Sequence, residues 1–100
     1  MNDWPHEAQR NHYIDLAAKH GVPEHTRTGF AWWIVDGLQP GGFLTAVLEN
    51  NLSQAFARAD SINRAAMFQI VSFLYNEAPG PCWGSPEKVR EWHEQFDGVP

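Results

Sequence analysis

The sequence contains little that favours covalent chemistry or a membrane location. It has a single cysteine, Cys82, so an intrachain disulfide is excluded and a reducing compartment is favoured. Its longest apolar runs are far shorter than the roughly 20 residues that span a membrane as a helix. Its first residues lack the basic start and apolar stretch of a signal peptide. We therefore expect a soluble cytoplasmic protein.

Positive charge is also scarce. Seven Lys and Arg stand against twelve Asp and Glu, the formal net charge is −5, and no cation lies between Arg27 and Arg58. Without a basic cluster, direct binding to nucleic acid is not expected, because such binding depends on neutralising phosphates. An acidic chain instead suits a basic partner, including a nucleic-acid-binding protein whose groove it blocks. Solubility alone explains the same charge in many proteins.

Known catalytic and metal-binding motifs are missing. The five histidines form no His-x-x-x-His pair and no zinc-like spacing with Cys82. No Gly-x-Ser-x-Gly turn surrounds a serine, and Gly41-Gly42 matches no phosphate-binding loop. A packed thiol explains Cys82 better than a nucleophile does. We predict no catalytic residue, no metal site and no cofactor, and we expect that the protein is not an enzyme.

Apolar residues, in contrast, are abundant. They make up 43% of the 100 residues and include five Trp, which places the chain among globular proteins of a single domain. They recur at spacings of three and four, which is typical of helices with one buried face. The predicted fold is all-α: a compact bundle of four to five short helices in one domain.

Pro, Gly and short polar residues mark where these helices begin and end. Gly21 and Gly37 are expected stops, and the adjacent Asn50 and Asn51 are poor helix formers at which the third helix can bend or break. We predict helices that begin at Asp3-Trp4-Pro5, at Pro23-Glu24, after the turn at 39–42, at Asp60 or Ser61, and at Ser85-Pro86-Glu87.

The third and fourth predicted helices carry the widest apolar stripes. The fourth runs to about Glu77. Because apolar residues cover most of its circumference, we expect it at the centre of the fold or in a subunit interface. The predicted stripe residues are Leu44, Val47, Leu48, Leu52, Ala55 and Phe56 in the third helix, and Ile62, Ala66, Met67, Ile70, Val71, Phe73 and Leu74 in the fourth.

Polar residues gather where these two helices meet. One interpretation is that Arg58 pairs with Asp60, which locks the corner and caps the following helix. The other is that guanidinium and amide groups bind an anionic ligand or a partner carboxylate, with an aromatic ring stacked on a base. The predicted ligand- or partner-binding residues are Arg58, Asp60, Asn63, Arg64, Asn51, Tyr75 and Trp83.

Trp32 and Trp33 are neighbours on the second predicted helix. Adjacent helical residues point about 100° apart, so the two rings cannot face the same way. We expect one ring in the core and the other at the rim or in an interface. The pair is the predicted oligomer or partner interface, and the protein is expected to be a homo-oligomer.

Five short motifs stand out along the chain. They are Pro23-Glu24-His25-Thr26-Arg27, Pro40-Gly41-Gly42-Phe43-Leu44-x-Ala46-Val47-Leu48, Arg58-Ala59-Asp60-x-x-Asn63, Leu74-Tyr75-Asn76 and Trp83-Gly84-Ser85-Pro86-Glu87. These motifs resemble a family of short proteins encoded by phages and prophages. The resemblance covers roughly Pro23 to Trp92, so we expect a family-like core at 23–96 and an added N-terminal helix at 1–22.

The resemblance implies a phage accessory protein that acts in the cytoplasm of a bacterial host. Small proteins of this kind often counter host defence by stoichiometric binding. Our first hypothesis is a non-enzymatic, anti-CRISPR-like inhibitor that binds a host defence protein complex. The alternative is an oligomeric sponge that sequesters a nucleotide immune signal through Arg58, Arg64, Asn51 and Asn63. A further alternative is a structural or regulatory helical module of the phage.

Overall fold

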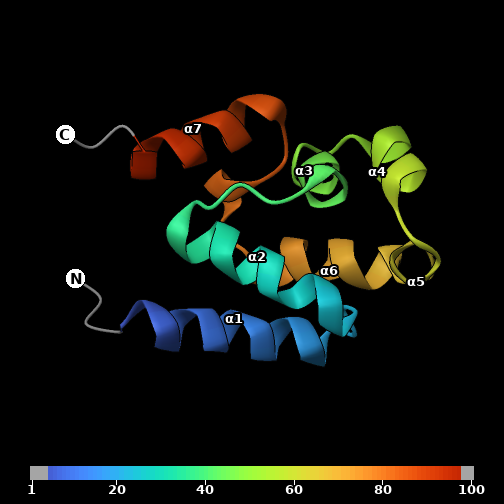
Figure 1. Ribbon diagram of the computed structural model, residues 1–100, viewed down its shortest axis with the longest axis horizontal. Helices are drawn as coiled ribbons and strands as arrows, with labels where there is room; N and C mark the ends of the chain where they lie inside the picture. Colours follow the sequence, from blue (N-terminus) through green and yellow to red (C-terminus); the bar gives the residue numbers. More distant parts are fainter. Residues whose placement is uncertain (1–4, 98–100) are drawn as a thin grey trace.

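The computed structural model describes residues 5–97, which fold into seven α-helices and one short 3₁₀ helix without a strand (Figure 1). This confirms the all-α prediction, whereas four to five helices is too few. The helices are α1 (His6–Lys19), α2 (Glu24–Asp36), α3 (Gly42–Leu48), α4 (Leu52–Arg58), α5 (Ser61–Ala65), α6 (Met67–Glu77), the 3₁₀ helix η1 (Gly80–Cys82) and α7 (Pro86–Asp97).

The two additional helices arise because two predicted helices are each divided. The third breaks at Asn50, whose φ of 62° is left-handed, and the Asn51 side chain caps α4 by accepting a hydrogen bond from the Gln54 N–H. Asn tolerates both roles better than most residues do. The fourth breaks at Ala66, which leaves helical geometry at φ −102° and ψ 15°, and α5 and α6 then point in different directions (Figure 1).

Most predicted boundaries coincide with observed ones. Gly37 ends α2 in a left-handed conformation (φ 65°), and an ideal Cβ there would collide with the Phe96 ring. The Asp60 side chain caps α5, and the Ser85 hydroxyl accepts a hydrogen bond from the Lys88 N–H at the start of α7. The first helix begins at His6. Asp3 and Trp4 of its predicted start lie outside the described residues.

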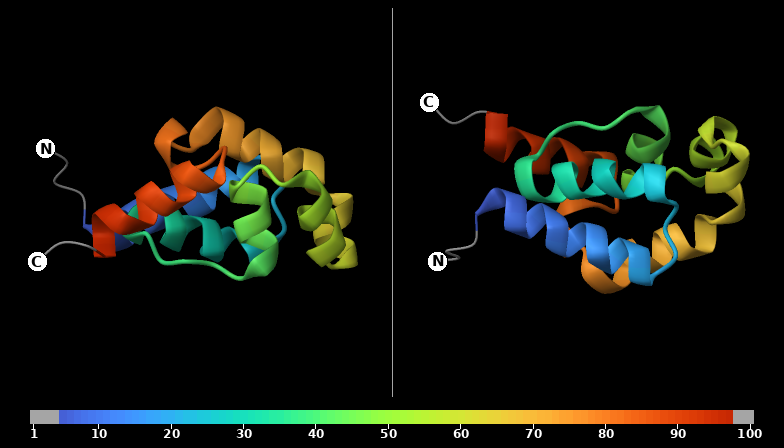
Figure 2. Two further views of the ribbon diagram at one scale, coloured as in Figure 1. Left: turned by 90° about the horizontal axis from the view of Figure 1, so that it is seen from above. Right: turned by 60° about the horizontal axis from the view of Figure 1, so that its bottom comes forward.

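The core lies where α1, α2 and α6 pack together, and α2 is sandwiched between α1 and α7 (Figures 1 and 2). Two indole N–H groups join its parts: Trp33 Nε1 donates to the Cys82 carbonyl oxygen, and Trp92 Nε1 donates to the Trp33 carbonyl oxygen. These bonds connect α2 to η1 and α7. The largest fully buried side chains are Trp33, Phe30, Phe73, Leu48, Ile70, Leu74, Val22 and Cys82.

Helix α1 belongs to this core. Ala17 on α1 and Val22 just after it are fully buried, and His20 Nε2 lies 2.8 Å from a Glu77 carboxylate oxygen on α6. At the other end of α1, Arg10 Nε donates to Asp36 over 2.7 Å. Burial alone would raise the pKa of Asp36, but hydrogen bonds from Arg10 and His6 outweigh it and hold that pKa below its ordinary value.

Four predicted stripe residues are solvent-exposed instead of buried, namely Leu52, Phe56, Ile62 and Val71. The first three lie on α4 and α5, which are short segments at the periphery of the molecule (Figure 1), so neither helix has neighbours on all sides. Helix α6 is central on one face only, because Ile70, Phe73 and Leu74 are fully buried while its opposite face meets solvent. None of the described helices has both the length and the apolar character needed to cross a membrane.

Candidate functional site

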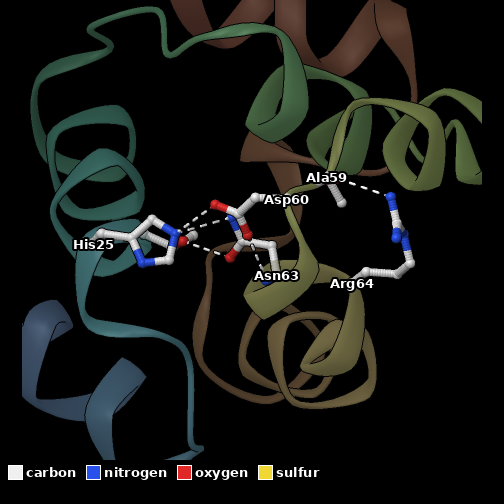
Figure 3. Close-up of polar contacts among 6 residues, drawn as sticks. His25, Ala59, Asp60, Asn63 and Arg64 are labelled. Atoms are coloured by element: carbon white, nitrogen blue, oxygen red, sulfur yellow. Dashed lines mark hydrogen bonds and ion pairs between the residues drawn. The ribbon is translucent and has the colours of Figure 1, made fainter.

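The Asp60-x-x-Asn63 motif lies against the start of α2, where it meets His25 and Thr26 (Figure 3). The Thr26 hydroxyl donates to Asn63 Oδ1 over 2.6 Å, and both residues are buried, at 3% and 6% exposure. His25 Nε2 lies 2.9 Å from Asp60 Oδ2. The other Asp60 oxygen accepts the Asn63 backbone N–H over 2.7 Å. The cluster therefore joins α2 to the first turn of α5.

Electrostatics in this cluster favour a charged Asp60. The backbone N–H of Asn63 is the largest cause that holds the pKa of Asp60 below its ordinary value, and His25 adds to it. A His–Asp pair is also the base and orienter of a catalytic triad. The adjacent Thr26 hydroxyl, however, is buried and already donates to Asn63. The contacts of the cluster serve helix packing and capping.

Arg64 and Arg58 do not join this cluster. Arg64 extends away from His25 and donates to the Ala59 carbonyl oxygen over 3.2 Å (Figure 3). Arg58 Nε donates to the Gln54 side chain over 3.2 Å, and no ion pair joins it to Asp60 among the described residues. The predicted Arg58–Asp60 corner lock is therefore wrong. Asp60 does cap the helix, but the side chain beside its carboxylate is His25, with Nε2 2.9 Å from Oδ2.

Arg58 instead lines an open polar groove of about 430 Å³ between α3 and α4. Its guanidinium lies over Gly42, where an ideal Cβ would sit 2.9 Å from Nη1, so a side chain at this position would displace it. With Nε bonded to Gln54, the Nη N–H groups make no hydrogen bond to a described residue. The groove is lined by Pro40, Gly42, Thr45, Ala46, Glu49, Asn51, Gln54 and Arg58.

Only Arg58 and Asn51 of the predicted ligand set line this groove. Asn51 also borders a small apolar pit of about 20 Å³ between α4 and α6, large enough for about one water molecule. Tyr75 is exposed on α6, and Trp83 is half-buried against the core. The predicted set is thus spread over several places: the groove, the α2–α5 cluster with Asp60 and Asn63, the Arg64–Ala59 contact, the α6 surface and the core margin.

The tryptophan pair is divided as helical geometry requires. Trp33 is fully buried in the core, and Trp32 is 37% exposed with the Arg10 guanidinium 3.9 Å from its ring centroid. Burial within its own chain removes Trp33 from the predicted interface. Only Trp32 of the pair remains accessible to a partner.

The Cys82 thiol is fully buried beside the core. Burial raises its pKa to about 12, so the thiol stays protonated near neutral pH. The nearby start of α7 does not offset this effect. No group of three or more His, Cys, Asp and Glu side chains within the described part of the chain is placed to hold a metal ion.

Sequence reasoning missed several residues of these sites. Gln54 had a local signal, because a glutamine four residues before Arg58 shares its helix face. Thr26 was missed, although its partner Asn63 was predicted, because the two lie 37 residues apart and no local pattern relates them. Glu49 and Gly42 border the groove only because the chain turns at Asn50 and brings α4 beside α3.

Comparisons with known proteins add no assignment: no protein-family model, curated protein or solved structure matches this chain.

Proposed function

We propose that this protein is a small non-enzymatic phage accessory protein that counters bacterial host defence by stoichiometric binding, and that it sequesters a nucleotide signal in the groove of Arg58. The proposal places it in the host cytoplasm. The observation that carries it is the guanidinium of Arg58, which faces an open polar groove with unused N–H donors.

The groove has the size and chemistry that a nucleotide needs. Its volume of about 430 Å³ falls within the range of about 300–1,000 Å³ of small-ligand sites. The two Nη groups of Arg58 can donate to two phosphate oxygens while its Nε stays hydrogen-bonded to Gln54. Glu49 and the amides of Asn51 and Gln54 supply acceptors and donors for the edge of a base.

Sequestration without turnover fits the state of the most reactive side chain. Cys82, the single thiol, is fully buried with a pKa of about 12, which favours a packing role. A binding protein that acts by holding its ligand needs only the groove and a stable scaffold. Groove residues Gly42 and Thr45 lie on α3, whose Val47 and Leu48 are buried in the core.

Nucleotide-dependent melting of the purified chain tests this function. Cyclic dinucleotides, cyclic trinucleotides and ADP-ribose-type nucleotides are added separately at increasing concentration. A ligand that binds only the native state raises its stability by about 2.7 kcal/mol at 100 times Kd, so the melting temperature rises with concentration. No shift with any of these nucleotides at millimolar concentration would overturn the proposal.

Arg58→Ala identifies the site. Because Arg58 is exposed, its loss leaves the melting temperature without nucleotide almost unchanged and removes the nucleotide-dependent rise. Arg90→Ala is the matched control, since Arg90 is exposed on α7 and its loss changes net charge equally. A full nucleotide shift in Arg58→Ala would show that the groove is not the site.

A second candidate function, the anti-CRISPR-like inhibitor of a host protein complex, is favoured by the net charge of −5. An acidic protein complements the basic groove of a nucleic-acid-binding complex, and such contacts weaken as salt rises. This function predicts that one host complex co-purifies with the protein in stoichiometric amount and dissociates from it in high salt. The Arg58→Ala variant should still bind this complex. Absence of a stoichiometric complex at low salt would exclude it.

A further inference from the structure

The outer face of α6 carries exposed apolar side chains. Phe68 is 81% and Tyr75 is 78% exposed, and Val71 lies between them. Residues at spacings of three, four and seven share one side of a helix, so the three side chains form a continuous stripe. Figure 2, left, shows α6 at an edge of the molecule with no other helix on its outer side.

The stripe continues onto α4. Leu52 and Val71 line the same small pit between the two helices, and Phe56 lies one turn after Leu52. We call this surface the α4–α6 face. It comprises Leu52 (62% exposed), Phe56 (38%), Phe68 (81%), Val71 (38%) and Tyr75 (78%).

Charge is absent from the helical segments that form this face. Neither 52–57 nor 65–76 contains Lys, Arg, Asp, Glu or His, although the chain as a whole carries a net charge of −5. Near a two-fold axis each side chain faces its own copy, so a charged residue there would meet the same charge. An uncharged face is therefore the part of this acidic protein where two copies approach with the least repulsion.

The area of the face is sufficient for a dimer. Taking about 200 Å² for a complete aromatic side chain, the exposed parts of the five residues sum to about 550 Å². Two copies would then bury about 1,100 Å² from these side chains alone, above the roughly 1,000 Å² of a specific interface. Gln69, Ser72 and Asn76 add uncharged hydrogen-bonding groups along the same helix.

We propose that a second copy of this chain covers the α4–α6 face in a two-fold symmetric dimer. Tyr75 and Phe68 are its anchors, because large aromatic side chains dominate the energy of such interfaces. The interface proposed for the predicted homo-oligomer is therefore the α4–α6 face and not the surface around Trp32. The inference does not depend on nucleotide binding, so either proposal stands if the other fails.

Sedimentation velocity of the full chain tests the dimer over a range of micromolar concentrations. The wild type is expected at twice its 11.3 kDa mass. Added salt is expected to strengthen the dimer, since it screens the repulsion between two acidic copies and removes no ion pair from the face. A monomer at high micromolar concentration, or dissociation by salt, would overturn the inference. A monomeric result would mean that a partner other than a second copy covers the α4–α6 face.

Phe68→Glu places two like charges in the interface and is expected to weaken dimerisation by more than about 30-fold. Tyr75→Glu makes the same change at the other end of the stripe. Gln95→Glu, which adds one charge to an exposed position on α7, is the control and should remain a dimer. Far-ultraviolet circular dichroism of each variant checks the fold. A dimer in both folded stripe variants, or a monomer in the control, would refute the proposed face.

Discussion

At the scale of single residues, the Thr26–Asn63 hydrogen bond offers the clearest test. Thr26→Val keeps the side-chain shape but leaves Asn63 Oδ1 buried without its 2.6 Å donor. The expected loss is about 1–3 kcal/mol in the free energy of unfolding, measured by chemical denaturation, because an unsatisfied buried acceptor carries its desolvation penalty.

Thr28→Val separates this effect from a general cost of valine in α2. Thr28 lies on the same helix but is exposed, so its substitution should change the free energy of unfolding by less than about 0.5 kcal/mol. Equal losses in the two variants would show that helix propensity, and not the hydrogen bond to Asn63, sets the cost.

The roles of some residues could be predicted from the sequence. Asp60 could be recognised as a cap because the acceptor and its N–H lie three residues apart. The split of Trp32 and Trp33 followed from helical geometry alone. The interpretation that Arg58 pairs with Asp60 was wrong because Asp60 and Gln54 both lie close to Arg58 in sequence, and the extended backbone at Ala59, with ψ 138°, turns Asp60 away.

At the scale of elements, the cap of α5 makes stability depend on pH. The folded-state pKa of Asp60 lies below the ordinary value of 3.8. The ionised carboxylate therefore stabilises the fold fully above the ordinary pKa, and this stabilisation is lost as the pH falls through the lower pKa of the folded state. Asp60→Asn retains an oxygen for the Asn63 N–H but cannot ionise. The melting temperature of the wild type should therefore exceed that of the variant at about pH 5, and the two should converge toward about pH 2.

If the difference in melting temperature between the wild type and Asp60→Asn stayed constant over this pH range, the assigned charge of Asp60 would be contradicted. The comparison isolates this carboxylate, because every other acidic residue is common to both proteins.

Element boundaries were predictable where the backbone itself requires a particular residue. Gly37 with positive φ ends α2, and Asn50 with positive φ ends α3. The break at Ala66 had no such signal, since alanine is the best helix former. Apolar spacing likewise described Ile62 as a core residue, because spacing shows which side chains share a face but not whether another element covers it.

At the scale of the whole molecule, the groove is a product of tertiary structure. Its lining comes from the 39–42 turn, α3 and α4, and its open shape depends on the break at Asn50. The α4–α6 face likewise appears only when other helices have covered the opposite side of α6. Hydrophobic patterns therefore predicted the all-α fold, while the position of each surface required the assembled chain.

The N-terminal helix was predicted from the sequence to be an addition at 1–22, whereas the structure places part of it in the core. Deleting this segment tests its contribution to stability. A chain that begins at Pro23 loses the fully buried Ala17 and Val22 and the His20–Glu77 contact. Burial of one large apolar side chain contributes about 1.5–3 kcal/mol, and Tyr13 and Leu16 also pack against the core. The combined loss is comparable with the roughly 5–15 kcal/mol that stabilise a domain.

We therefore expect the shortened chain to lose its cooperative thermal transition in circular dichroism. His20→Gln in the full chain is the matched control: it breaks the contact with Glu77 but keeps the apolar side chains, so it should lower stability by no more than about 1 kcal/mol. If the shortened chain melted like the wild type, residues 23–96 would be an autonomous core. If His20→Gln were as damaging as the deletion, the polar contact, and not burial, would be what joins α1 to α6.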